Sequence, residues 1–180
     1  MTVVVREATL SDREHALHVE REAFGGPTEA EIVRAVRDLA GSFGLVIEED
    51  GTVVGHVQLS RAWVGSDPVL ALGPIGVLPA RQGRGIGSAL VEAALAAARK
   101  RREIAVILLG SQAFYPRFGF RAGASFGLRN PFAGAQEEGF VVAQEDFMLA
   151  PLGDPAASLV GEARWHPSFG DPVEGGADPR

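Results

Sequence analysis

Apolar and polar positions along the chain predict strands and helices in turn. Residues 2–9 form a β-branched run that predicts a first strand. The run ends at Ser11 and Glu14, whose spacing is that of a helix capping box, so we expect a helix over about residues 11–23. The chain therefore begins with a strand followed by a helix.

A second helix and a hairpin are predicted next. Thr28 and Glu31 repeat the capping-box spacing, and the helix that they start is expected to close at Gly41. Two apolar runs within residues 43–64 are joined by Asp50-Gly51, a dipeptide typical of tight hairpin turns. We expect these runs to pair as antiparallel strands.

The centre of the sequence predicts one parallel crossover. Residues 68–79 are almost continuously apolar and indicate a buried strand with an irregularity near Pro74. Helical spacing follows over residues 83–102, and residues 103–110 read as a second buried strand. Because strand-helix-strand connections are right-handed, these two strands should lie parallel in one sheet.

The last third of the chain is less regular. A short helix is expected over residues 111–120, and two further strands over residues 121–130 and 138–152. We predict an α/β (α+β mixed) fold in one domain over residues 1–150. Residues 151–180 form a Pro/Gly-rich extension, partly docked and with its last residues frayed.

Within this extension, "GEARWHPSF" is expected to add an edge strand. It can pair within the chain or across a homodimer, and Trp165 should be buried in either case.

Composition narrows the chemistry. The chain has 180 residues and a net charge of −6. It contains no cysteine, which excludes disulfides, thiolate metal sites and cysteine nucleophiles. The acidic balance argues against nucleic-acid binding. Acidic residues come too early for a signal peptide and no apolar run is long enough for a membrane, so we expect a cytoplasmic protein without a membrane partner. His15 and His18 indicate a solvated helix face, and no metal site is expected.

The stretch "RQGRGIGSAL", residues 81–90, carries three glycines ahead of the main helix. A buried strand, a glycine loop and a helix N-terminus in that order favour an anion, so we expect a ligand with phosphates. Arg81 and Arg84 add positive charge, and Gln82 offers an amide donor. The loop has neither the lysine of a Walker motif nor the glycine spacing of a dinucleotide fingerprint.

The pattern Gln82-x-x-Gly85-x-Gly87, in the context "LGPIGVLPARQGRGIGSAL" and followed by "LLGSQAFYPRFGF", resembles the GCN5-related N-acetyltransferase (GNAT) superfamily, most of all its bacterial YhbS-like branch. The resemblance covers roughly residues 3–150. It implies a mixed, mostly antiparallel sheet flanked by helices, in which the central parallel pair splays apart. It also implies acetyl-CoA as co-substrate and direct acetyl transfer to a primary amine of a small molecule or peptide.

The resemblance further implies a set of acetyl-CoA-binding residues. The strand backbone would pair with the pantetheine arm, and the amide of Val77 would polarise the thioester carbonyl. The loop amides would hold the pyrophosphate. The residues so implied are Ile75, Gly76, Val77, Leu78, Gln82, Gly83, Arg84, Gly85, Ile86, Gly87 and Ser88.

Tyr115 is the only tyrosine and stands where the family commonly places the acid that protonates the CoA thiolate. Packing of Tyr115 among neighbouring phenylalanines is the alternative. Ser111 and Gln112 are candidates for hydrogen bonds to pantetheine, and capping of the short helix by Ser111 is an equal alternative.

The sequence leaves open which group acts as the base that deprotonates the acceptor. Residues 71–79 contain no Asp or Glu, which favours a water relay, with His56, Glu22 and Glu31 as further candidates. Solvated helix faces and a packed strand histidine are the preferred interpretations of these three residues. A module that binds acetyl-CoA as a sensor, without transferring the acetyl group, also remains open.

The acceptor pocket should be walled by residues 23–31 and 129–140. Glu137 and Glu138 are candidates for attracting a cationic acceptor, and surface charge is the alternative.

Overall fold

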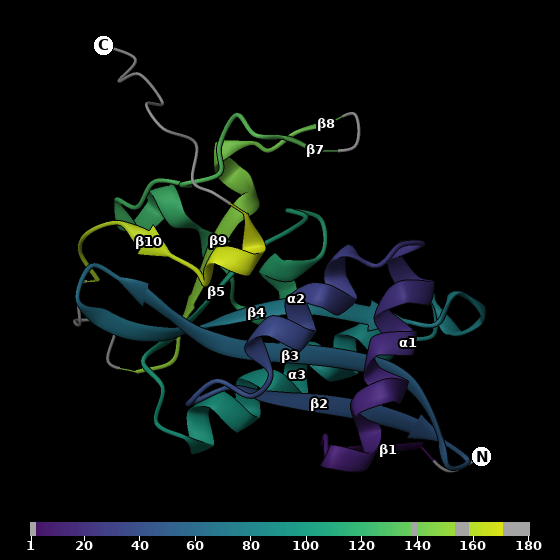
Figure 1. The fold of residues 1–180 in the computed structure, drawn as a ribbon. Helices are drawn as coiled ribbons and strands as arrows, with labels where there is room; N and C mark the ends of the chain where they lie inside the picture. The colour runs from purple at the N-terminus through teal and green to yellow at the C-terminus, as the bar shows by residue number, and fades with distance from the viewer. Residues whose placement is uncertain (1–2, 138–139, 154–158, 171–180) are drawn as a thin grey trace.

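The β-branched and alternating runs form a single large sheet in the computed structural model, which describes residues 3–137, 140–153 and 159–170 (Figure 1). Within these residues the sheet has eight strands in the order β1-β2-β3-β4-β5-β9-β6, with β10 paired to β3. Its strands are β1 (Val3–Glu7), β2 (Phe43–Glu49), β3 (Thr52–Val64), β4 (Asp67–Val77), β5 (Ala105–Leu109), β6 (Arg121–Ala122), β9 (Phe147–Pro151) and β10 (Ala163–Arg164). A separate small hairpin joins β7 (Gln136–Glu137) to β8 (Phe140–Val141).

Helices cover both faces of the sheet. Helices α1 (Arg13–Phe24) and α2 (Thr28–Val36) lie on one face, and α3 (Ile86–Lys100) lies on the other (Figure 1). Strand β3 serves both layers because its side chains alternate. Leu59 packs into the core that contains Leu90 of α3, whereas His56 reaches Glu20 of α1.

The predicted hairpin and crossover are both confirmed. Asp50 and Gly51 have φ values of 48° and 81°, the left-handed geometry that a tight two-residue turn requires. Strands β4 and β5 are parallel, and they pair only at Leu70 with Val106 and at Ala71 with Ile107. Beyond that point β4 diverges from β5, with a cis peptide bond between Gly73 and Pro74. The sheet is therefore split along one side of β4.

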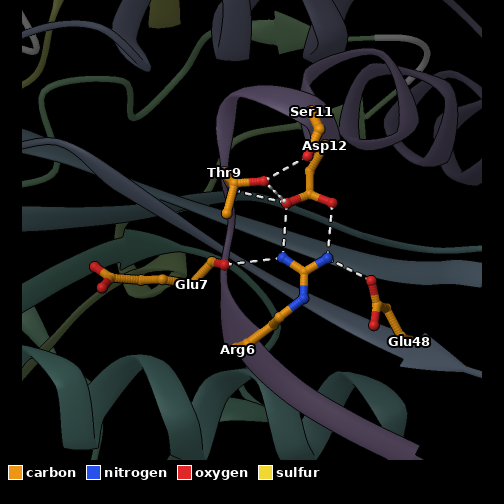
Figure 2. Close-up of polar contacts among 6 residues, drawn as sticks. All are labelled: Arg6, Glu7, Thr9, Ser11, Asp12 and Glu48. Atoms are coloured by element: carbon orange, nitrogen blue, oxygen red, sulfur yellow. Dashed lines mark hydrogen bonds and ion pairs between the residues drawn. The ribbon is translucent and has the colours of Figure 1, made fainter. Parts of the chain in front are cut away.

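Three predicted helix boundaries are wrong, and the first is the start of α1. The N-terminal cap consists of Thr9 and Asp12, not Ser11 and Glu14, and a 3-10 turn over Leu10–Asp12 precedes α1. The backbone N–H of Thr9 donates to Asp12 Oδ2 at 2.6 Å, and Arg6 donates two bonds to the same carboxylate at 2.7 and 2.8 Å (Figure 2). Arg6 also pairs with Glu48 of β2, so Asp12 is fixed from the sheet.

Helix α2 ends at Val36 rather than at Gly41. The chain then turns, with the N–H of Leu39 donating to the Val36 carbonyl. The main helix begins at Ile86, so the glycines at 83 and 85 lie in a loop ahead of it. The predicted strand over residues 121–130 is reduced to β6, because a 3-10 turn over Gly123–Phe126 follows it and residues 127–130 form no strand.

The Arg6–Asp12 pair predicts a pH-dependent contribution to stability. The hydrogen bonds from Arg6 hold the pKa of Asp12 well below its ordinary value. A depressed carboxyl pKa stabilises the fold above the unfolded pKa of about 4, and this is lost as pH falls through the folded value. We expect Asp12→Asn to lower the free energy of unfolding by about 2 kcal/mol at pH 7.

Urea unfolding at pH 7 and at pH 3 tests this. The difference between the two proteins should shrink at pH 3. An equal difference at both pH values would contradict the role of the charge. Asp38→Asn is a suitable control, because Asp38 pairs with Arg13 at the exposed surface.

The C-terminal extension docks within the chain. Ala163 and Arg164 pair antiparallel with Val64 and Trp63 of β3. The prediction for Trp165 is wrong, since its side chain is only half-buried. Its ring packs edge-on against Phe147 and leaves one side facing a cavity described below. In the described part of the chain, no helix is both long and apolar enough to cross a membrane.

Candidate active site

The glycine loop has the geometry of a site for an anionic ligand. Gly83 and Gly85 have φ values of 73° and 82°, which side-chain-bearing residues rarely adopt. The first helical hydrogen bond of α3 runs from Ala89 N to Gly85 O. The amides of residues 86–88 therefore precede the helical ladder and carry the positive end of the helix dipole.

These amides border a cavity of about 580 Å³, which we call the loop cavity. Its walls come from the end of α1, the diverging part of β4, the glycine loop and the turn after β5. The predicted binding residues in these walls are Ile75, Val77, Gln82, Gly83, Gly85, Ile86, Gly87 and Ser88. Gly76, Leu78 and Arg84 do not line the cavity.

Two polar side chains of the loop are already engaged. The Gln82 amide donates to the Val77 carbonyl at 3.0 Å. Arg81 Nε donates to Glu49 Oε2 at 2.6 Å. Arg117, which sequence analysis missed, also lines the loop cavity, and its guanidinium stacks near Phe114.

Tyr115 stands between this cavity and a second one, lining both. Its ring packs edge-on against Phe114 and Phe120, with centroids 5.0 and 5.7 Å away. The aromatic ring of Tyr115 thus packs among phenylalanines, as the alternative interpretation predicted. Burial raises the pKa of the Tyr115 hydroxyl to about 12, so the phenol stays protonated at neutral pH and is able to donate a proton.

The other residues of this corner have structural partners. The Ser111 hydroxyl accepts from Ala113 N at 3.1 Å, which is the capping alternative, and Ser111 lines the second cavity. The Gln112 side chain donates to the Glu145 carbonyl and lines neither cavity.

The second cavity, of about 460 Å³, is here called the aromatic cavity. Phe24, Phe114, Trp165 and Phe169 line it together with Tyr115. The predicted wall over residues 23–31 contributes Phe24 and Glu29, whereas residues 129–135 do not line it. Glu138 and the side chain of Glu137 lie outside the described residues.

None of the three candidate bases lines the loop cavity or the aromatic cavity. Glu22 and Glu31 are exposed, and Glu31 pairs with Arg34 at 2.8 Å. His56 is buried, and its Nδ1 lies 2.6 Å from Oε1 of Glu20, a residue that sequence analysis did not single out. Burial raises the pKa of Glu20, and the hydrogen bond with His56 opposes the rise.

The Glu20–His56 pair packs directly beneath β4. A Cβ added to Gly76 would come within 2.7 Å of Glu20 Oε2, so the glycine makes room for the carboxylate. The pair joins α1, β3 and β4 beside the cavity walls formed by Ile75 and Val77.

Comparisons with known proteins agree on one family. A model of the acetyltransferase (GNAT) family matches residues 13–120. The uncharacterized N-acetyltransferase YjhQ of Escherichia coli K12 is 31% identical over 117 residues, which are 61% of this chain and 65% of that protein. The chain thus spans less than two thirds of YjhQ. YhbS of the same strain, also an uncharacterized N-acetyltransferase, is 29% identical over 154 residues, 83% of this chain and 87% of YhbS.

Solved structures show the same relationship. The crystal structure of E. coli YhbS in complex with CoA superposes with a TM-score of 0.80 at 27% identity, covering 93% of this chain and 91% of YhbS. The structure of a GNAT acetyltransferase from Brucella melitensis in complex with acetyl-CoA has a TM-score of 0.74 at 30% identity. The match covers 94% of this chain and 99% of the Brucella chain. Since the family model spans more than half of the sequence, the chain belongs to the GNAT family of acetyltransferases.

Proposed function

We propose that this acyltransferase moves an acetyl group from acetyl-CoA directly to a primary amine of a small molecule or peptide. One observation carries the proposal: the free amides at the start of α3 and the phenol of Tyr115 border the same cavity. CoA and acetyl-CoA in the YhbS and Brucella structures support the identity of the co-substrate.

The chain's own groups suit this chemistry. The amides of residues 86–88 would bind the pyrophosphate, with Gly83 and Gly85 allowing its close approach. The unpaired side of β4 would bind the pantetheine arm, and the amide of Val77 would stabilise the oxyanion. These roles are assigned by analogy with the family and by geometry.

Acetyl-CoA supplies the thioester carbonyl that the amine attacks. The new C–N bond replaces the C–S bond, and Tyr115 would give its proton to the departing thiolate. The proton lost by the amine passes to solvent. Without a cysteine in the chain, no acyl-thioester intermediate on the protein is available.

A second function, binding of acetyl-CoA without transfer, is favoured by one feature. Among the described residues, no Asp or Glu lines the loop cavity, so this cavity itself offers no carboxylate base. Such a module would bind acetyl-CoA and release no thiol.

Calorimetric titration with acetyl-CoA, followed by thiol-release assays over a panel of amines, separates these functions. Binding with thiol release supports the transferase. Binding without release from any amine supports the non-transferring module. Absence of acetyl-CoA binding contradicts both.

Gly87→Leu should abolish most of the affinity for acetyl-CoA while keeping the fold. A Cβ at Gly87 meets Phe114 and Val77 only at ordinary distances of 3.8 and 4.0 Å, and the longer side chain would occupy the cavity. We expect the Kd to rise at least about tenfold.

Gly26→Ala, at a position with open space, is the matched control. Thermal unfolding confirms that both variants fold. An unchanged Kd for the leucine variant would place acetyl-CoA elsewhere.

A further inference from the structure

The aromatic cavity, unlike the glycine loop, lies where the acceptor is expected to bind. It shares Phe24, Ile75, Phe114 and Tyr115 with the loop cavity, so the two cavities meet where acetyl transfer is expected. One site is thus open to acetyl-CoA from one side and to an acceptor from the other. This inference rests on the proposed function.

Among the described residues that line this cavity, Glu29 is the only charged one. The other described residues lining it carry no Asp, Glu, Lys, Arg or His. Glu29 lies in the first turn of α2, where the helix dipole favours a carboxylate. It forms no ion pair with a described basic residue, whereas Glu31, two positions on, pairs with Arg34. Its negative charge also reaches buried Glu20, whose pKa it raises after the larger effect of burial.

Most of the remaining wall is apolar, and its C-terminal part is held by packing and backbone pairing. Trp165 packs edge-on against Phe132 and Phe147, with ring centroids 5.3 and 5.4 Å away. Pairing of β10 with β3 fixes this segment, and Arg164 donates to the Gly65 carbonyl at 2.7 Å. The following turn, with Phe169, packs against α2.

We propose that the acceptor is a small amine with a single positive charge on an aromatic or bulky apolar body. Glu29 pairs with its ammonium group, and Phe24, Ile32, Trp165 and Phe169 enclose its body. Aromatic faces add attraction for the ammonium group as it enters. A second ammonium, as in a polyamine, would lose its hydration against these walls without a second carboxylate to pair with.

Initial-rate thiol release with acetyl-CoA compares 2-phenylethylamine and tryptamine with ethanolamine, spermidine and a peptide that begins with glycine. We expect kcat/KM for the two aromatic amines to exceed that of the others at least about tenfold. A preference for ethanolamine, spermidine or the peptide would overturn the inference while leaving the transferase function intact.

Two pairs of variants locate the effect. Glu29→Gln should raise KM for 2-phenylethylamine about tenfold or more, and Glu31→Gln should leave it unchanged within about twofold. Phe169→Ala should lower kcat/KM for the aromatic amines and narrow their advantage over ethanolamine. Val160→Ala, at a 71% exposed position of the same extension, should leave kcat/KM for the aromatic amines unchanged. Equal effects of variant and control in either pair would contradict the assignment.

Binding gives an independent readout. Titration of 2-phenylethylamine into the acetyl-CoA-saturated protein should show binding that Glu29→Gln weakens. If acetyl-CoA binds and the amine does not, the inference fails and the family function stands. If hexanoyl-CoA is used more efficiently than acetyl-CoA and the amine preference is absent, the cavity holds an acyl chain and the inference also fails. If acetyl-CoA itself does not bind, the proposed function fails.

Discussion

Replacement of Tyr115 by phenylalanine should lower kcat by about two orders of magnitude, the contribution typical of a general acid. The change removes only the hydroxyl and leaves the ring, which packs against Phe114 and Phe120. The Kd for acetyl-CoA should stay within about twofold, and the thermal unfolding midpoint should hardly change. Steady-state thiol release, with calorimetry for binding, measures both quantities.

The pH profile provides a second test of the same role. A phenol must be protonated to act as an acid, and burial raises the pKa of Tyr115 to about 12. Tyr115 should therefore cause no loss of kcat between about pH 8 and pH 10. Phe118→Leu, in the same turn but lining neither cavity, is the control. Turnover of Tyr115→Phe equal to wild type would leave the tyrosine with packing alone.

Loss of His56 should destabilise the protein by about 3–5 kcal/mol, because it leaves the carboxylate of Glu20 buried without its partner. Glu20 and His56 are 0% and 1% exposed, so water is not available to replace the hydrogen bond. We expect His56→Ala to unfold at correspondingly lower urea concentration. His18→Ala, on the exposed side of α1, should cost less than about 0.5 kcal/mol.

The pH dependence of this loss identifies its cause. Because burial raises the pKa of Glu20, ionisation of Glu20 opposes folding as pH rises through that value. The loss in free energy of unfolding caused by His56→Ala should therefore be larger at pH 8 than at pH 5. Glu20→Gln keeps a hydrogen-bonding group without a charge and should be milder than His56→Ala. If the stability lost in His56→Ala does not depend on pH, the loss comes from packing alone.

The sequence predicted those features that local chemistry determines. Asp50-Gly51 turns the hairpin because both residues adopt left-handed geometry, and Gly83 and Gly85 do so in the loop. The parallel crossover followed from element order alone. The predicted start of the first helix was wrong because two capping boxes competed there. Thr9 with Asp12 forms the cap, since Arg6 binds the Asp12 carboxylate from β1.

The missed residues are those whose partners are distant in the chain. Glu20 and His56 are 36 positions apart, and neither shows in the local pattern that the other is near. Glu29 and Glu31 share one helical turn, so only the docking of α2 decides which carboxylate enters the cavity. The histidine's separation from both cavities likewise depends on which face of β3 it occupies.

The docking of β10 on β3 has a consequence for how this enzyme can diversify. Trp165 and Phe169 lie beyond residues 13–120, the stretch that the family model matches, yet they wall the aromatic cavity. Substitutions there leave residues 83–88 untouched. Part of the proposed acceptor wall thus lies on a segment that can change in evolution, or be exchanged by recombination, without disturbing the glycine loop.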